Sequence, residues 1–367
     1  MFLSKIKVIN FKNCREEKIT FSDKINCFVG CNGAGKTNLL DAIYYLSFTK
    51  SYFNFSDQQN ICHGQEFFAI HGTFIKDDAT PDEISCIQKQ NTKKQLKINQ
   101  KEYDKISEHI GRFPCVMVSP YDRDLINEGS DVRRKFIDTV ISQFDKIYLS
   151  DLIKYNKFIE QRNSLLKKFG HFQQQDYSFL QLIDEQVAPI AEKIHQKRKS
   201  FIHDFEPIFE KHFNFISGGN ENVEIEYESQ LNIDTYLQTV KKQYKKDLDL
   251  RYSTVGVHKD DFIFKMDGYP IKKYGSQGQQ KSFAVALKLA QFEFTRNILK
   301  YNPLLLLDDI FDKLDAQRVQ KLIALVSGTD FGQIFITDTE TQRTRQTFEH
   351  ININYKIFEI SKGKILK

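Results

Sequence analysis

The chain has 367 residues, of which 40% are hydrophobic, so it is long enough to bury a sizeable core and to form two structural units. Its formal net charge of +5 is mildly basic, which is compatible with a nucleic-acid partner but does not by itself indicate one. No apolar run approaches the roughly 18 residues of a membrane span, no signal peptide is recognisable, and the six cysteines include no C-x-x-C pair, so we expect a cytoplasmic protein with reduced thiols.

The first part of the chain predicts short strands around a glycine-rich loop. Residues 25–29 form an apolar run that is typical of a buried strand. Residues 30–37 contain three glycines, and residues 38–46 then carry apolar side chains at helical spacing. Further strands, separated by polar turns, are predicted between residues 67 and 97. This part therefore predicts α/β structure built on strand, loop and helix.

The loop has the sequence GCNGAGKT and fits the phosphate-binding pattern G-x-x-x-x-G-K-S/T. Glycine lets the backbone approach phosphate oxygens, and the N–H groups at the start of the next helix favour an anion. Lys36 can reach the β- and γ-phosphates, and the Thr37 hydroxyl can ligate Mg²⁺. A plain glycine turn is the alternative, but Lys-Thr at this spacing favours a nucleoside triphosphate. The predicted phosphate-binding residues are Gly30, Cys31, Asn32, Gly33, Ala34, Gly35, Lys36 and Thr37.

The middle of the chain changes to helical periodicity. In residues 150–169 and 180–194, apolar side chains recur at steps of three and four residues. These two helices predict an antiparallel pair, either a projecting coiled-coil-like arm or two ordinary core helices. Pro189 lies within the second pattern, so we expect a kink or a break there. We expect a helical arm domain of residues 141–245 to interrupt an α/β domain made of residues 1–140 and 246–367.

Two adjacent acids follow four consecutive leucines near the end of the chain. The leucines, residues 304–307, are typical of a strand buried on both faces. A carboxylate at the end of such a strand can hold Mg²⁺, so we assign this role to Asp308. Asp309 is then placed to orient or deprotonate an attacking water. Ordinary loop polarity is the alternative, which the phosphate-binding loop disfavours. Because Asp is one methylene shorter than the Glu of most comparable ATPases, hydrolysis is expected to be slow.

The turn Gly275–Lys281 precedes a predicted helix of residues 278–300. Ser276 offers a hydroxyl, Gly278 permits close backbone approach, and the helix N-terminus favours an anion. A simple serine N-cap explains the same residue types equally well. The other possibility is a second surface that faces a phosphate group. Its predicted residues are Ser276, Gln277, Gly278 and Gln279.

The order of these motifs resembles the ABC-type ATPase heads of SMC-like DNA-repair proteins and, more closely, the RecF family. The resemblance runs from end to end and includes Asn10–Lys12, Asn32–Ile43, residues 119–138, Tyr155 and Asn156, Gln161–Lys167, Val255–Asp261 and Ser276–Lys281. The chain departs from the family's usual residues at Tyr121, Val257 and Lys259. The resemblance implies an ABC-type P-loop ATPase head, a mixed sheet with helices, interrupted by a helical arm.

The resemblance also implies a mechanism. ATP and Mg²⁺ would lie between two copies of the chain, with the signature serine of one copy completing the ATP site of the other. Asp315 would cross this dimer interface beside the nucleotide, and Lys36 and Asp309 would support weak, DNA-stimulated hydrolysis. The implied partners are DNA, double-stranded, single-stranded or gapped, together with RecO and RecR. The implied process is RecA loading, with replication restart and SOS induction.

DNA contacts are less well marked in the sequence. Three basic clusters, Lys93-Lys94, Lys197–Lys199 and Lys241–Lys246, are candidates, and each could equally be a solvated face. His258 is a secondary site candidate. The alternative functions are a transporter ATPase subunit, a P-loop kinase and another SMC-like DNA-repair ATPase. The insertion and the S-Q-G-Q-Q turn disfavour the first two, and the short arm disfavours the third.

Overall fold

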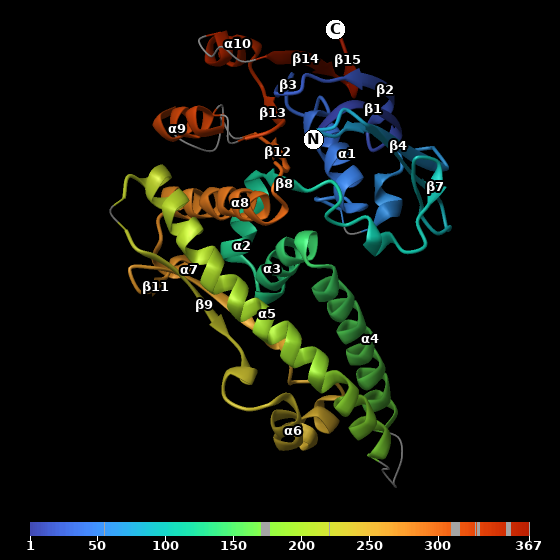
Figure 1. The fold of residues 1–367 in the computed structure, drawn as a ribbon, viewed down its shortest axis with the longest axis vertical. Helices are drawn as coiled ribbons and strands as arrows, with labels where there is room; N and C mark the ends of the chain where they lie inside the picture. The colour runs from blue at the N-terminus through green and yellow to red at the C-terminus, as the bar shows by residue number, and fades with distance from the viewer. Residues whose placement is uncertain are drawn as a thin grey trace. The chain divides into compact units, whose positions relative to one another are not determined.

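The computed structural model describes residues 1–54, 56–169, 177–219, 221–309, 316–326, 328, 331–349 and 354–366 (Figure 1). Internal contacts divide the chain into two compact units. Unit 1 comprises residues 1–122, 215–219 and 281–367, and unit 2 comprises residues 123–214 and 220–280.

A largely parallel sheet forms the centre of unit 1. Its strand order is β15-β14-β3-β13-β12-β8, and every pairing between β14 and β8 along this order is parallel. All residues of β3, β8, β12 and β13 are buried, as expected for strands covered on both faces. The bounds are β3 (Ile25–Val29), β8 (Cys115–Val118), β12 (Leu304–Leu307), β13 (Ile334–Asp338), β14 (Tyr355–Ser361) and β15 (Lys364–Ile365).

A second sheet of unit 1 is antiparallel. Its order is β2-β1-β4-β5-β6-β7, and alternate residues of β5 are buried, which gives this sheet one core face. Helix α1 packs its buried face, including Leu40 and Tyr45, into the same core cluster as β1 and β4. The bounds are β1 (Phe2–Phe11), β2 (Cys14–Thr20), α1 (Lys36–Phe48), β4 (Phe67–Ile75), β5 (Pro81–Lys89), β6 (Gln95–Ile98) and β7 (Lys101–Glu102).

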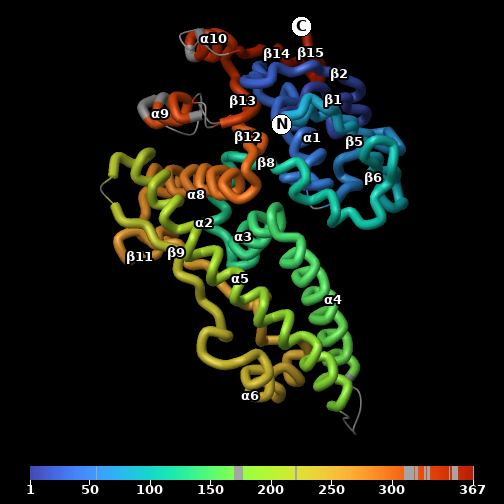
Figure 2. The backbone as a smooth tube through the Cα atoms, viewed as in Figure 1, coloured from blue at the N-terminus to red at the C-terminus, as the bar shows by residue number. Residues whose placement is uncertain are grey.

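The later helices complete the α/β pattern that the sequence predicts. Helix α8 (Gln277–Leu299) begins in unit 2 and continues into unit 1. Helices α9 (Ala316–Val326) and α10 (Thr341–Glu349) flank β13 in the sequence. Figure 2 traces this part of the backbone from α8 through β12 and β13 to the C-terminal strands.

Unit 2 is built on two long helices that run side by side (Figure 1). Contacts between α4 (Lys146–Phe169) and α5 (Ser178–Ser217) join Tyr148 to Arg198 and Arg162 to Asp184, so the helices are antiparallel, as predicted. Its other elements are α2 (Asp124–Asn127), α3 (Ser130–Phe144), β9 (Val223–Glu228), α6 (Tyr236–Leu250), β10 (Asp261–Met266), β11 (Tyr269–Pro270) and α7 (Ile271–Tyr274).

The helix α5 does not end at a proline. It continues through Pro189 and Pro207 for 40 residues, so the break considered for Pro189 is not present. Buried apolar residues on both sides of Pro189, such as Val187 and Ala191, anchor this segment. Their packing offsets the missing hydrogen bond, which costs about 3 kcal/mol in an isolated helix.

The units do not end where the predicted domains do. The sequence places the head at residues 1–140 and 246–367 and the arm at 141–245, whereas the compact units change at 122/123 and 280/281. The reason is packing within unit 2, because α3 contacts both α4 and β10. The compact units follow packing within the chain, so the boundaries of the head and the arm stay a prediction.

Candidate nucleotide-binding site

Two predicted site segments and the end of a third strand meet at one edge of the parallel sheet. The loop Gly30–Thr37 follows β3, Asp308 and Asp309 follow β12, and Thr337 and Asp338 end β13. Because β3, β13 and β12 are parallel neighbours, their carboxyl ends lie at the same edge. This is the edge at which open α/β sheets bind their ligands.

The glycines give the loop its shape and leave it open. Gly35 has φ +111°, and a Cβ there would lie 2.7 Å from Asn13 Nδ2, so only glycine fits. Gly33 has φ +77°, and a Cβ there would meet nothing within 4 Å. Cys31, Asn32 and Gly33 are exposed. The glycines therefore let the backbone between strand and helix turn without strain and leave space beside Gly33, as a phosphate group requires.

Lys36 points back into this loop. Its Nζ donates to the carbonyl oxygens of Gly30, at 2.7 Å, and Cys31, at 3.1 Å, although the residue is only 7% exposed. Within the described ranges no carboxylate forms an ion pair with Lys36. A mostly buried cation held by neutral carbonyls is suited to a phosphate oxygen as its counter-ion.

Asp308 lies between two threonines. Its Oδ1 accepts hydrogen bonds from Thr37 Oγ1 at 2.9 Å and from Thr337 Oγ1 at 2.8 Å, and it is only 3% exposed. Burial raises the pKa of Asp308, with a smaller contribution from Asp309, while the two threonine hydroxyls oppose the increase. A divalent cation at this carboxylate would relieve the cost of its buried charge.

The residues fit Mg²⁺ as the sequence predicts. Thr37 and Asp308 bring a hydroxyl and a carboxylate oxygen within 2.9 Å of each other. The described part of the chain holds no group of three His, Cys, Asp or Glu that could form an all-protein metal cage. Mg²⁺ characteristically takes one or two protein oxygens and completes its shell with phosphate and water.

Thr337 is a site residue that the sequence analysis missed. Its Oγ1 donates to Asp308 Oδ1 and accepts the backbone N–H of Asp309 at 2.8 Å. Asp309 has φ +51°, so this hydrogen bond holds a backbone conformation that is uncommon for a residue with a side chain. The sequence could have indicated Thr337 only through its position near the end of a predicted strand, since β13 pairs with β12.

Asp338 has a structural role. Its carboxylate accepts the backbone N–H of Thr339 at 2.7 Å and the hydroxyl of Thr344 at 2.8 Å, and it also pairs with Arg343. These contacts fix the start of α10. Its backbone oxygen accepts the N–H of Gly30 at 3.2 Å, which ties β13 to the phosphate-binding loop.

The S-Q-G-Q-Q turn begins helix α8 with a capping box. Gln279 N donates to Ser276 Oγ at 3.2 Å, and Ser276 N donates to Gln279 Oε1 at 2.8 Å. Ser276 is therefore the N-cap of α8, which is one of the two roles considered for it in the sequence. Ser276 and Gln277 are nevertheless exposed, so the capping serine remains accessible to a second molecule. Asp315, the remaining predicted interface residue, lies outside the described residues.

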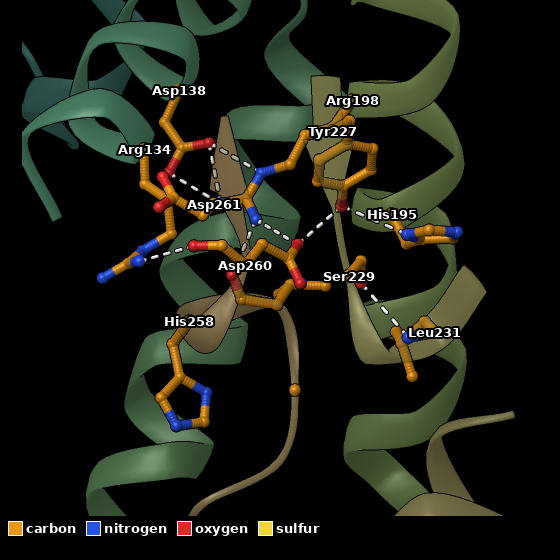
Figure 3. A network of polar contacts seen from close by, with 12 residues as sticks. Arg134, Asp138, His195, Arg198, Tyr227, Ser229, Leu231, His258, Asp260 and Asp261 are labelled. Atoms are coloured by element: carbon orange, nitrogen blue, oxygen red, sulfur yellow. Dashed lines mark hydrogen bonds and ion pairs between the residues drawn. The ribbon is translucent and has the colours of Figure 1, made fainter. Parts of the chain in front are cut away.

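Asp138 and Asp260, two acids in the segments that carry the family resemblance, lie in a largely buried polar network of unit 2 (Figure 3). The guanidinium of Arg198 contacts Asp138 at 2.9 Å and Asp260 at 2.8 Å. Tyr227 donates to Asp260 at 2.5 Å and also contacts His195 at 3.1 Å. These contacts join α3, α5, β9 and the segment before β10, so the network has a structural role within unit 2.

His258 belongs to this structural group as well. Its Nδ1 is 2.6 Å from Tyr155 OH and its Nε2 is 3.3 Å from the backbone oxygen of Ser253. Burial is the main cause that lowers the pKa of His258 to about 4. The ring is therefore neutral and engaged at both nitrogens at physiological pH, which favours a positioning role within unit 2 over acid–base chemistry.

The three basic clusters differ in how much charge they expose. Arg198 is buried, Lys197 pairs with Asp145 at 2.7 Å, and Lys94 pairs with Asp57 at 2.7 Å. By contrast, α6 exposes four lysines, of which Lys242 pairs with Asp234 at 2.6 Å. The four are Lys241, Lys242, Lys245 and Lys246.

Comparison with known proteins places these features in a family context. Residues 2–365 match the family model described as the RecF/RecN/SMC N-terminal domain. The "DNA replication and repair protein RecF" of Flavobacterium johnsoniae is 50% identical over 98% of this chain and all of its own length. The protein of the same name from Bacteroides thetaiotaomicron is 48% identical over the whole chain and 98% of its own length.

The comparison with solved structures agrees with this family assignment. A structure described as the recombination mediator RecF with ATP in the RecFOR pathway superposes with a TM-score of 0.89 and 31% identity, covering 99% of this chain and 96% of that one. An Smc head bound to the C-terminal winged-helix domain of ScpA reaches 0.57 at 15% identity over the whole chain and 96% of its own length. The second match shows the head fold alone. No helix among the described residues is long and apolar enough to cross a membrane.

Proposed function

Since the chain belongs to the RecF/RecN/SMC family and, within it, to the RecF proteins, we propose that it is an ATP-dependent DNA-binding protein of recombinational repair and replication restart. The observation that carries this proposal is the meeting of Lys36 and the Thr37–Asp308–Thr337 cluster at one sheet edge. The loop, cation and carboxylate have the arrangement that a triphosphate with Mg²⁺ requires.

Each site residue has a role in this proposal. Backbone N–H groups of Gly30–Thr37 bind the phosphates, and Lys36 exchanges its loop carbonyls for phosphate oxygens. Thr37 and Asp308 would hold Mg²⁺, which would supply neutralisation of the phosphate charge. Asp309 orients the attacking water and accepts its proton. Hydrolysis is weak, because a shorter acid stands where most comparable ATPases carry Glu.

A second copy of the chain completes the site. Ser276, Gln277, Gly278 and Gln279 of one copy contact the nucleotide held by the other, together with Asp315. Exposure of Ser276 at the start of α8 supports this role, because the helix N-terminus adds a favourable field for the γ-phosphate. ATP then joins two copies around DNA, and slow hydrolysis releases them.

DNA and mediator proteins are the proposed partners. The exposed lysines of α6 bind the phosphate backbone of double-stranded, single-stranded or gapped DNA, without reading its sequence. The relatives' name and the RecFOR description of the similar structure support RecO and RecR as partners that load RecA. Another SMC-like DNA-repair ATPase is the alternative, which the lower similarity to the Smc head disfavours.

The composite site is tested by Ser276→Arg. Sedimentation velocity with ATP and Mg²⁺ is expected to show dimers for the parental chain and monomers for the variant, while the monomer keeps its nucleotide affinity. The substitution also removes the N-cap hydroxyl of α8, at a cost of about 1 kcal/mol, so circular dichroism is used to check that the variant is folded. Dimers of Ser276→Arg at the parental ATP concentration would overturn the composite site.

A further inference from the structure

Two tyrosines and two lysines stand exposed beside the S-Q-G-Q-Q turn. Tyr269 is 61% and Tyr274 is 68% exposed, and their ring centroids are 5.4 Å apart. Lys272 and Lys273, between them in the sequence, are also exposed. We call Tyr269, Lys272, Lys273 and Tyr274 the tyrosine–lysine patch. Large exposed aromatic side chains next to one another indicate an interaction surface.

The patch and Ser276 form one rigid piece. Ile271, at the start of α7, is buried, and a Cβ on Gly275 would lie 2.5 Å from its Cγ1, so the chain turns tightly there. Gln280 Nε2 donates to the backbone oxygens of Ile271 and Gly275, both at 3.3 Å. Tyr269 is held by pairing with Met266 of β10. The patch therefore lies within a few residues of Ser276 on the same tightly held segment, where a molecule that binds Ser276 can also reach it.

Within the part of the chain that the structure describes, the patch has no charged or aromatic partner other than its own members. Among the described residues, neither Lys272 nor Lys273 forms an ion pair, and the tyrosine rings contact one another rather than a third ring. Adjacent unpaired lysines repel each other, and exposed tyrosines add nothing to the core. Both kinds of side chain gain their partners only in a complex.

We propose that the tyrosine–lysine patch recognises the nucleotide-loaded loop of a second copy of the chain. This inference rests on the proposed composite site, which brings Ser276 to the other copy's γ-phosphate. The lysines offset the negative charge that the triphosphate retains beside Mg²⁺, and the tyrosines cover the exposed backbone of Cys31–Gly33. The patch is thus the part of the interface that senses whether the other copy holds a nucleotide.

The charges of the two surfaces become complementary when the nucleotide is bound. Without it, the cation of Lys36 is buried among loop carbonyls near Asp308, so the loop has less negative charge for the patch lysines to meet. With a bound triphosphate and Mg²⁺, the same loop carries net negative charge and attracts these lysines. The patch therefore favours dimerisation of loaded copies over empty ones, which gives the nucleotide dependence a physical cause.

The test compares four variants of the full chain by sedimentation velocity at increasing ATP with Mg²⁺. Tyr269→Ala/Tyr274→Ala and Lys272→Gln/Lys273→Gln remove the two halves of the patch. Tyr252→Ala is the matched control, because Tyr252 is an exposed tyrosine of the same unit, and Ser276→Arg reports on the composite site itself. Nucleotide affinity of each monomer is measured with a fluorescent ATP analogue, and folding by circular dichroism.

Both patch variants are expected to bind nucleotide within about twofold of the parental chain and to dimerise at least about tenfold more weakly. Tyr252→Ala should behave as the parental chain. Dimerisation of both patch variants at parental strength, with Ser276→Arg monomeric, would overturn the patch and leave the composite site intact. Dimers of Ser276→Arg would overturn both. If the patch variants instead lose only affinity for single-stranded DNA, the patch is a base-stacking surface and the assignment is wrong.

Discussion

At the scale of single residues, the site depends on a short chain of hydrogen bonds. Thr37 and Thr337 both donate to Asp308, and Thr337 also accepts the N–H of Asp309. One threonine thus links the residue assigned to the cation with the residue assigned to the water. The loop and both acids could be predicted from the sequence because each motif is local. Thr337 could not, because its role depends on the pairing of β12 with β13.

Replacing Lys36 by alanine is expected to weaken ATP binding by at least about 100-fold, because the loop loses its one charged donor to the phosphates. Equilibrium titration with a fluorescent ATP analogue measures this change. Lys93→Ala, which removes an exposed lysine far along the chain, is the control and should bind normally. Equal affinity of Lys36→Ala and the parental chain would remove the loop from its assigned role.

Asp309→Asn is expected to keep ATP affinity but to lower the hydrolysis rate by about 100-fold or more, since an amide cannot accept the proton of the attacking water. The variant should therefore accumulate as a DNA-bound dimer in the presence of ATP. Phosphate release and gel-shift assays measure the two effects. Hydrolysis by Asp309→Asn at the parental rate would show that another group orients the water.

At the scale of elements, unit 2 is held together by buried ion pairs between residues distant in sequence. Arg162 joins α4 to Asp184 of α5 at 2.7 Å and to Asp247 of α6 at 2.6 Å. The antiparallel helix pair follows from periodicity and could be predicted. These pairings could not, because partners separated by 22 and 85 residues leave no local pattern. The same holds for Arg198, which the sequence offered as part of a DNA-binding cluster.

His258 should make the stability of the protein depend on pH. Its pKa is about 4 in the folded chain, lowered mainly by burial from the ordinary histidine value of 6.5. Between these two pH values the histidine is protonated in the unfolded chain and neutral in the folded chain. The contribution of His258 to the free energy of unfolding is therefore complete above about pH 6.5 and decreases as the pH falls towards 4. For His258 this loss amounts to about 2 kcal/mol at pH 5.

His258→Gln removes the titrating group and should flatten this dependence. Urea unfolding followed by circular dichroism at pH 7.5 and pH 5 measures it, since the chain has no tryptophan for fluorescence. The parental chain is expected to lose about 2 kcal/mol more than the variant between the two pH values. An equal loss in both proteins would show that His258 is not responsible.

The lysines of α6 should determine the salt dependence of DNA binding. Replacing Lys241, Lys245 and Lys246 by glutamine is expected to reduce the slope of log K against log salt concentration by about 2–3, because each phosphate contact contributes about 0.9 on duplex DNA. The control replaces three exposed lysines elsewhere, Lys89, Lys101 and Lys105. Equal slopes for the two triple variants would remove α6 from the DNA-binding surface.

At the scale of the whole molecule, the proposed composite nucleotide site draws on both units of the chain. The phosphate-binding loop and its acids belong to unit 1, whereas Ser276 and the tyrosine–lysine patch belong to unit 2. In a dimer with a two-fold axis, the phosphate-binding loop of each copy would meet Ser276 and the tyrosine–lysine patch of the other. Both nucleotide sites would then be complete, so no third copy could join in the same way. In this proposal the nucleotide would link the two copies, and its hydrolysis would limit how long they remain joined.

The central claim is that ATP controls the association of two copies. Light scattering coupled to size exclusion measures it directly, with and without ATP and Mg²⁺, using Asp309→Asn to slow hydrolysis and gapped DNA in a second set. The chain of 43.1 kDa is expected to elute as a monomer without nucleotide and to double its mass with ATP, and only the dimer should retain gapped DNA. A monomer mass at saturating ATP, or a dimer of equal strength without nucleotide, would contradict the account.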